Sequence, residues 1–302
     1  MAANITALRR QISSAGDLKS VVRVMKASAA SAIGQYERSV AALADYAHTV
    51  ELGLGVCLRT VDSSGQPLRL SSTHAEDNVV HAVVFGSDQG LVGRFNEVVV
   101  DYALGQSASG ATKIWAVGER VHERLIDAGR QLEGAFVVPG SVEQITRLVG
   151  QILQKIPTAG SAIEPQNTTL ILFYNRPNDA GYNPVSQRLL PLDGHWERGL
   201  AQQPWPTAQL PEVLSANAQT LRAFIREHLF VSLFRASAES LASENASRLA
   251  AMQRADRNIG ELLLELNANY HRLRQAGIDE ELFDVISGFD ALLPSADSGA
   301  QP

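Results

Sequence analysis

The sequence predicts an α/β protein in which a long helix at each end of the chain pairs antiparallel with the other as a coiled coil, beside a small α/β domain. Three observations predict this class: helical apolar periodicity at both ends, strands alternating with helices between them, and a composition rich in alanine and leucine. Of 302 residues, 45% are hydrophobic but only 6% are aromatic. Unbranched side chains lose little freedom in helices, whereas β-sandwiches use β-branched and aromatic residues. The composition therefore favours long helices.

Residues 1–60 are expected to form the N-terminal helix. Its apolar or small residues recur in steps of three and four, which is typical of the seam of a coiled coil, the row of residues facing the partner helix. The predicted seam contains Ile5, Leu8, Ile12, Ala15, Leu18, Val22, Met25, Ala29, Ala32, Tyr36, Val40, Leu43, Ala47, Val50 and Leu54. Two three-residue steps in succession, ending at Leu18, predict a local stammer. Gly16 and Gly34 are positions at which the helix can bend.

Residues 211–293 are expected to form the C-terminal helix, which begins just after Pro211. At about 1.5 Å per residue, some eighty residues reach on the order of 120 Å, so the helix must project from the body or be covered by partners. Residues 294–302 are expected to be a flexible tail. The predicted seam contains Leu214, Ala218, Leu221, Ile225, Leu229, Leu233, Leu241, Asn245, Leu249, Met252, Asp256, Ile259, Leu263, Leu266, Tyr270 and Leu273.

The charges of the two helices are complementary. Residues 1–38 carry six cations against two carboxylates, net +4, and residues 240–293 carry five arginines against nine carboxylates, net −4. Opposite charge and two apolar seams favour pairing of the helices within one chain. Solvated faces are the alternative, because exposed ion pairs contribute only ~0–1 kcal/mol each.

Residues 78–192 are expected to form the α/β domain. Strands alternate with helices there, which predicts βαβ units and a Rossmann-like, mainly parallel sheet whose last strand turns antiparallel. The expected strands are 79–86, 113–118, 136–138, 168–174 and 184–192, and the expected helices are 91–104, 119–129 and 142–156. The polar segments 63–77 and 193–211 are expected to be linkers.

The first of these strands is followed by a glycine-rich turn, Gly86-Ser-Asp-Gln-Gly-Leu-Val-Gly93. Such a turn before a helix can cradle a phosphate, and it can also be purely structural. The glycine spacing differs from that of the dinucleotide fingerprint, and the second strand ends in Ala116-Val117-Gly118 without an acidic residue. None of the four lysines follows a glycine, so there is no Walker A loop. The structural interpretation is favoured, and ATP hydrolysis by this chain alone is not expected.

Other chemistry is also poorly represented. The single cysteine, Cys57, excludes an internal disulfide and any multi-thiolate metal site, and suits a reducing compartment. The seven histidines lack ligand spacing, and there is no G-x-S-x-G elbow. A net charge of −6 gives no basic field for nucleic acid. No apolar run approaches the ~20 residues of a membrane span, and no signal peptide is recognised. We expect no catalytic site, cofactor or metal, and membrane association only through partners.

Several separated segments resemble, in order, the γ subunit of F-type ATP synthases. Val24–Ser31 resembles that family's "AMKMVAAS", Ser87–Asn96 its "SDRGLCGGLN", and Ser186–Leu192 its "SQLLPL" strand. The most specific matches lie in the C-terminal helix, at residues 239–252, 258–259, 270–278 and 286–288. The resemblance covers nearly the whole chain.

The sequence also departs from the family's pattern. Residues 12–21 contain one lysine where the family is rich in cations, Gln89 and Val92 replace a basic residue and a cysteine or alanine, and Asp279 replaces a small hydroxyl residue. The dithiol insert of chloroplast homologues is absent. These departures indicate a divergent bacterial member, and the alternative F-type ATPases thought to move Na⁺ are one subtype that fits.

The resemblance implies a rotor. In the family, the paired helices form the central stalk inside a ring of three α and three β subunits, and the α/β domain sits at the foot with the ε subunit on the membrane c ring. Rotation couples ion flow to ATP synthesis or hydrolysis on β. The chain itself would carry no catalytic site and would lie peripherally at the cytoplasmic face of a bacterial inner membrane.

The resemblance also implies roles for individual residues. Met25 and Lys26 would face β, Arg274 and Gln275 would form a polar catch to β, and Arg248 would brace the coiled coil near Met25. The apolar end of the helix would sit in the bearing sleeve; it contains Leu282, Val285, Ile286, Phe289, Leu292 and Leu293. Spacing alone favours Met25 as a plain seam residue, and Arg274 is equally part of a solvated helix face.

Two other classes stay open. A stand-alone α/β ligand-binding domain with helical oligomerisation arms would bind a ligand through segment 78–192. A structural coiled-coil homodimer would associate through both helices, although their opposite charges suit pairing within one chain.

Overall fold

The computed structural model describes residues 2–59, 79–106, 112–156, 168–179, 181–209, 211 and 217–292. The chain divides into two compact units, and both long helices contribute to each of them. The first unit comprises residues 1–27 and 252–302, and the second comprises residues 28–251. The predicted linker 63–77 and the predicted tail 294–302 lie outside the described residues.

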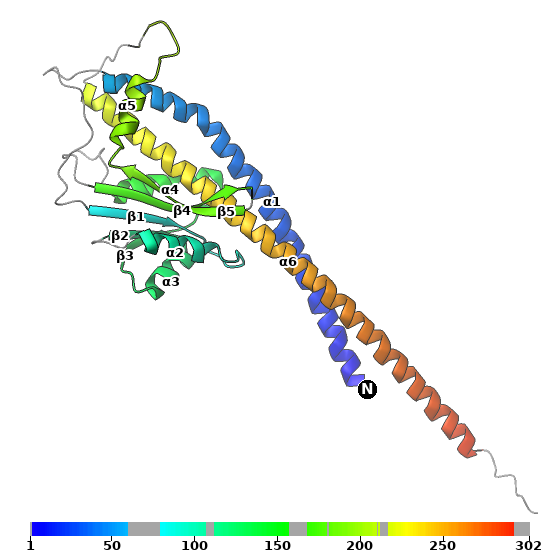
Figure 1. Cartoon of the computed structure of the whole chain (residues 1–302). Coiled ribbons are helices and arrows are strands. Elements are labelled where there is room, and N and C mark those ends of the chain that lie inside the picture. The colour runs from blue at the N-terminus through cyan, green and yellow to red at the C-terminus, as the bar shows by residue number, and fades with distance from the viewer. Residues whose placement is uncertain are drawn as a thin grey trace, which may run out of the picture. The chain divides into compact units, whose positions relative to one another are not determined.

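Two long helices are present, α1 (Ala2–Arg59) and α6 (Asn217–Leu292), as Figure 1 shows. Gly16 and Gly34 lie within α1 without interrupting it. The predicted start of the C-terminal helix at Pro211 cannot be followed residue by residue, because residues 212–216 lie outside the described part of the chain.

The stammer predicted at Leu18 is wrong. Leu18 is 58% exposed, whereas its neighbour Lys19 is half-buried. The seam of α1 therefore continues from Ala15 through Lys19 and Val22 to Lys26, in alternating steps of four and three. This regular spacing keeps one face of the helix turned to its partner. A lysine is tolerated there because its aliphatic stem can cover apolar surface. Its ammonium lies beside α6, where Nζ would be 3.5 Å from a Cβ on Gly260 and where its charge helps to lower the pKa of Asp256.

In the first unit α1 and α6 pair antiparallel. Lys26 Nζ donates to Asp256 Oδ2 at 2.8 Å, and Arg9 donates to the Tyr270 hydroxyl through Nε at 2.9 Å and Nη2 at 2.6 Å. A lower residue number on α1 thus pairs with a higher one on α6, which confirms the predicted antiparallel orientation. Among the described residues, Lys26–Asp256 is the one ion pair that joins the two helices, so the apolar seam carries most of the pairing.

The second unit contains a five-stranded sheet in the order β3-β2-β1-β4-β5. Neighbouring strands are parallel except β4 and β5, which are antiparallel, so the predicted mainly parallel sheet with an antiparallel last strand is confirmed. The strands are β1 (Val79–Phe85), β2 (Thr112–Val117), β3 (Leu132–Phe136), β4 (Thr168–Asn178) and β5 (Gly181–Leu190).

The third strand lies earlier than the predicted 136–138, because the preceding helix ends early. Gly129 has a φ of 75°, its N–H donates to the Ile126 carbonyl, and the Arg130 N–H donates to the Leu125 carbonyl. This pair of bonds is a Schellman cap, which stops the helix and turns the chain into β3.

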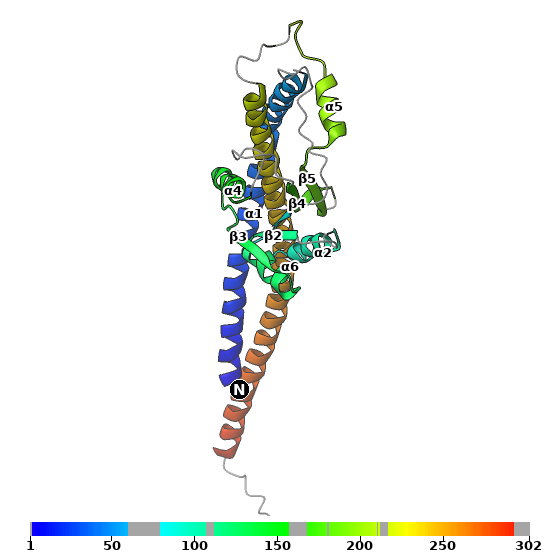
Figure 2. The same ribbon diagram turned by 90° about the vertical axis from the view of Figure 1, so that its left-hand side faces the viewer.

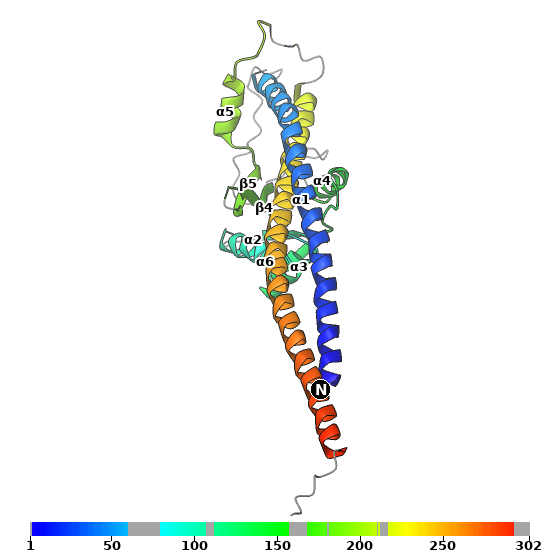
Figure 3. The ribbon, with the colours of Figure 1, turned by 90° about the vertical axis from the view of Figure 1, so that its right-hand side faces the viewer.

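Helices cover both faces of the sheet (Figures 2 and 3), and α2 and α4 lie on opposite sides of it. Helices α2 (Phe95–Gln106) and α3 (Glu119–Asp127) bury Val99, Val121 and Leu125 against one face. Helix α4 (Val142–Lys155) packs on the other face, in a larger core that also contains Leu54 of α1 and Leu233 of α6. The small sheet thus shares its core with the long helices.

Segment 193–211 is not simply a linker. It contains helix α5 (Gly194–Gln202), whose N-terminus is capped by the Asp193 carboxylate accepting from the His195 N–H at 3.0 Å. Its Leu200 is 6% exposed and belongs to the larger core. A helix this short is not stable by itself, so its existence depends on tertiary packing that the polar sequence does not announce. None of the described helices has the length and apolarity needed to span a membrane.

Candidate functional site

The glycine-rich turn after β1 is packed tightly against helix α3. A Cβ on Gly86 would lie 1.9 Å from Val121 Cγ2 and 2.7 Å from Asn96 Oδ1, so only glycine fits there. Further along, Leu91 and Gly93 have positive φ values of 63° and 57°. Gly86 therefore allows the turn to approach α3 closely, and Gly93 allows the backbone to adopt a positive φ.

Polar groups of the turn are already bonded within the protein. The Ser87 N–H donates to Asn96 Oδ1 at 3.0 Å, and Asn96 Nδ2 donates to Ser87 Oγ at 2.9 Å. The Asp88 carboxylate accepts from the Glu119 N–H, at the start of α3, and from the Val138 N–H, both at 3.0 Å. A phosphate at the start of α3 would be repelled by the Asp88 carboxylate and would find the Glu119 N–H already hydrogen-bonded. These contacts support the structural interpretation of the turn.

The carboxyl edge of the sheet is fastened to α6 by serines. Ser247 Oγ donates to the Val92 carbonyl at 2.5 Å, and Ser243 Oγ donates to the Asn175 carbonyl at 2.9 Å. Asn175 in turn donates through Nδ2 to the Phe95 carbonyl at 2.9 Å. Sequence reasoning missed this attachment, although two serines four residues apart within a seam helix were a visible signal. The edge where α/β proteins commonly bind ligands is here used to hold the long helix.

Buried carboxylates of α6 are paired with arginines. Glu239 accepts from Arg176 Nε at 2.9 Å and from Arg235 Nε at 2.8 Å. Glu244 is 5% exposed and accepts from Arg248 Nη2 at 2.6 Å. Burial raises the pKa of the Glu244 carboxyl, and the Arg248 charge opposes that rise.

Arg248, expected to brace the coiled coil near Met25, makes its described hydrogen bonds on its own helix, to Glu244 and Asn245. The Arg248 charge also acts on Tyr36 of α1, within the same unit. Burial and the Glu244 carboxylate raise the pKa of the Tyr36 hydroxyl, and Arg248 opposes that rise. The proximity of Arg248 to Met25 stays a prediction.

Met25 and Lys26, expected to face a partner, are both half-buried on α1 in the first unit. The Lys26 ammonium is directed at Asp256, whose pKa is lowered first by that hydrogen bond and further by the charges of Lys26, Lys19 and Arg23. Three cations therefore surround one carboxylate at this level of the seam, which leaves the first unit locally positive.

The remaining predicted interface residues lie exposed along α6. Arg274 and Gln275 are exposed, and neither forms a hydrogen bond or ion pair with another described residue. Leu282, Val285 and Ile286 are 56%, 70% and 47% exposed, while the Phe289 side chain lies outside the described residues. Sequence reasoning missed the equally exposed Ile278 and Phe283 of α6, and Leu18, Val21 and Val24 of α1. So many apolar side chains in water on one unit are typical of an interaction surface.

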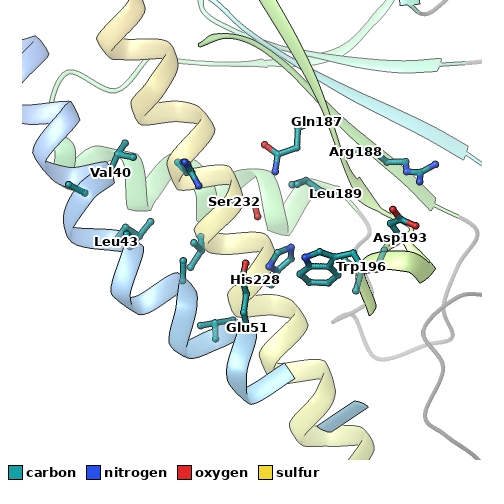
Figure 4. Close-up of a pocket in the computed structure, with 17 residues that line it drawn as sticks. Val40, Leu43, Glu51, Gln187, Arg188, Leu189, Asp193, Trp196, His228 and Ser232 are labelled. Atoms are coloured by element: carbon teal, nitrogen blue, oxygen red, sulfur yellow. The ribbon is translucent and has the colours of Figure 1, made fainter. Parts of the chain in front are cut away.

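A groove of about 590 Å³ lies between α1, α6 and the β5–α5 connection (Figure 4). Its walls are largely apolar, with Leu43 from α1, Leu189 from β5 and Trp196 from α5. The Trp196 and His228 rings are in contact, with centroids 4.6 Å apart and planes inclined at 40°. Burial lowers the pKa of His228 to about 4, so this ring is neutral at pH 7. Among the described residues, no group of three or more histidine, cysteine or carboxylate side chains is placed to hold a metal ion.

Comparison with known proteins agrees with this architecture. The family model described as ATP synthase matches residues 4–292. The ATP synthase gamma chain of Paramagnetospirillum magneticum is 30% identical over 298 residues, covering 96% of this chain and all of the relative. That of Granulibacter bethesdensis is 29% identical, with the same coverage of both chains.

Solved structures share the fold. A chain of the OSCP/F1/c-ring portion of the Euglena gracilis mitochondrial ATP synthase superposes with a TM-score of 0.64 over the full length of both chains, at 15% identity. A chain of the rotor of that synthase superposes with a TM-score of 0.59, covering 92% of this chain and all of the other, again at 15% identity. With the family match over nearly the whole sequence, these findings show that the chain belongs to the gamma chain family of F-type ATP synthases.

Proposed function

We propose that the chain, as a central-stalk subunit of an F-type ATP synthase, is the rotor that couples ion flow through the membrane sector to ATP synthesis or hydrolysis on a hexamer of α and β subunits. The observation that carries this proposal is the pair of long antiparallel helices, in a chain that the family model matches from residue 4 to 292. Catalysis would belong to β.

The proposed partners are the α, β and ε subunits and the c ring. The exposed apolar residues of the first unit support contact with the hexamer, because a surface of this kind is stable in water only when covered. Within that surface, Met25, Lys26, Arg274 and Gln275 are the proposed contacts to β, and Arg248 is the proposed brace. Leu282, Val285, Ile286 and Phe289 are the proposed bearing residues.

The chain would be held at the cytoplasmic face of a bacterial inner membrane by its partners. The divergent residues noted in the sequence support a bacterial member, and the coupling ion would be chosen by the membrane sector rather than by this chain.

The test is reconstitution with α and β subunits from the same source. We expect a stable complex and Mg-ATP hydrolysis faster than that of α and β without this chain. Absence of a complex, together with no gain in hydrolysis, would refute the rotor function. A ligand-binding domain with helical oligomerisation arms, the alternative, would instead bind a small molecule through the α/β part. The glycine-rich turn counts against that alternative, because the nearby Glu119 and Val138 amides already donate to the Asp88 carboxylate.

A further inference from the structure

Helix α5 is held at both ends by groups from outside its own length. At its start, Asp193 accepts from the His195 N–H. At its end, Arg59, the last residue of α1, donates through Nε to the Ala201 carbonyl at 2.6 Å and through Nη2 to the Gln203 carbonyl. A cation at the C-terminus of a helix satisfies free carbonyls and interacts favourably with the helix dipole. The Arg59 fork therefore joins α1 to α5 by two directional bonds.

Glycine lets the two helices approach closely at the same place. A Cβ on Gly55 of α1 would lie 2.6 Å from the Leu200 carbonyl oxygen of α5. Two residues earlier, a Cβ on Gly53 would lie 2.3 Å from the Phe224 ring of α6. The last turns of α1 are thus fitted against α5 and α6. A side chain at Gly55 would meet the α5 backbone and separate α1 from α5, whereas one at Gly53 would displace the Phe224 ring.

The other side of α5 faces α6 and continues into the sheet. Trp196 packs against His228 of α6 (Figure 4), and only residues 191–193 separate α5 from the end of β5. Helix α5 therefore connects the end of α1 to α6 and, through the chain itself, to the sheet.

The directional nature of the Arg59 contact matters mechanically. The hydrophobic effect that drives burial of the α1–α6 seam is non-directional, whereas a hydrogen bond fixes particular atoms of two elements against each other. The sheet is tied to α6 by directional bonds from Ser243 and Ser247. For α1 in this unit, such bonds run from Tyr46 to Glu227 of α6 at 2.7 Å and from Arg59 to α5. Because Tyr46 is 44% exposed and Arg59 is partly buried, the Arg59 contact is the better shielded of the two.

We infer that Arg59 is a positioning residue for rotary coupling: its guanidinium locks α5 onto the end of α1, so that α1, α6 and the sheet turn as one body. The inference rests on the proposed rotor function. Loss of the lock would let α1 slip against the sheet under load, and rotation generated at one end of the helices would be transmitted incompletely to the body. Hydrolysis on the hexamer would continue while less ion is moved per ATP.

The test uses the complete synthase from the same source, reconstituted in lipid vesicles with wild-type chain or with Arg59→Met. The methionine keeps much of the aliphatic stem and removes the fork. Arg59→Lys keeps the charge but supplies a single point donor instead of a planar fork. Arg198→Met is the matched control, because it removes an exposed arginine of α5 itself. Two quantities are measured on each preparation: the rate of ATP hydrolysis, and the ions moved per ATP, with H⁺ and Na⁺ followed separately.

For Arg59→Met we expect hydrolysis within about twofold of wild type and ions moved per ATP lowered by about twofold or more, as two charge-assisted bonds are lost. Arg59→Lys should fall between, and Arg198→Met should match wild type. Wild-type ion transport per ATP in Arg59→Met would overturn the inference. If Arg59→Met does not assemble, Arg59→Lys decides, and full coupling in that variant would overturn it too. Failure of the wild-type chain to stimulate hydrolysis would refute the rotor function itself, which keeps the two outcomes distinct.

Discussion

Replacing Gly86 with alanine tests whether the glycine-rich turn is structural. The new methyl group would sit 1.9 Å from Val121 Cγ2 and 2.8 Å from Val121 Cβ. Carbon atoms in contact are normally about 3.5–4.0 Å apart, so a gap of roughly 1.5–2 Å must open. Val121 is fully buried and cannot swing into solvent. Overpacking of a closed core costs about 1–3 kcal/mol.

A second cost comes from Asn96. Its Oδ1 would lie 2.7 Å from the new methyl group. The Asn96 side chain must therefore move, which breaks the hydrogen bond that Oδ1 now accepts from the Ser87 N–H. Losing a buried hydrogen bond costs about 1 kcal/mol more. We therefore expect Gly86→Ala to lower the free energy of unfolding by about 3 kcal/mol, which for a unit of this size corresponds to a fall in Tm of roughly 6–12 °C.

The measurement is urea unfolding of the full-length chain followed by tryptophan fluorescence. All three tryptophans lie in the second unit, so this signal does not report directly on residues 1–27 and 252–302 of the first unit. Gly90→Ala, in the same turn, is the matched control, because a Cβ there meets nothing within 4 Å. It should be neutral or stabilising by up to about 1 kcal/mol. Equal unfolding free energies for the two variants, within about 0.5 kcal/mol, would refute the reasoning.

Three further predictions concern charged and interface groups. Because Lys26 lowers the pKa of Asp256, the contribution of this carboxylate to stability is complete above its ordinary pKa and is lost as the pH falls through the lowered value. In thermal melts of the full-length chain between pH 7 and 3, Asp256→Asn should therefore lose less stability than wild type as the pH falls. Identical pH profiles for the two proteins would contradict this. Burial lowers the pKa of His228 from 6.5 to about 4, so the free energy of unfolding should fall by up to about 3 kcal/mol as the pH is lowered from 6.5 to 4. His228→Phe should flatten this pH dependence. An imidazole that titrates near 6.5 by NMR would exclude the buried, neutral ring packed against Trp196. Arg274→Ala should weaken coupling or turnover of the assembled synthase while circular dichroism of the isolated chain stays unchanged, and wild-type rates in the mutant assembly would remove Arg274 from the proposed contact to β.

The long helices could be predicted because their periodicity extends over many turns. Apolar residues every three or four positions allow no other regular structure over such lengths, and alternation of strand and helix patterns in the middle similarly indicated a mainly parallel sheet. The error at Leu18 has a physical origin. Apolarity alone assigns leucine to the seam, but an unbroken heptad assigns that place to Lys19, whose stem is apolar enough to lie there.

The candidate contacts were less predictable. The chemistry of the glycine-rich turn depends on Asp88 meeting the Glu119 and Val138 amides, residues 31 and 50 positions away. Pairing of buried Glu239 with Arg176 and Arg235 likewise joins segments 63 residues apart as well as neighbours on one helix. Local patterns carry no information about such distant partners.

By itself, the sequence determined the class of the protein, the two long antiparallel helices, the order of strands and helices, and the absence of recognisable catalytic motifs. These features follow from local periodicity and from residue types that are present or missing. Only the structure decided where the third strand lies, the presence of helix α5, and the contact of Arg59 with α5. The position of the third strand follows from a local glycine cap that ends α3 early, which periodicity alone does not reveal. The other two depend on non-local contacts: a short helix stable only when packed, and a guanidinium that meets carbonyls more than 140 residues away along the chain.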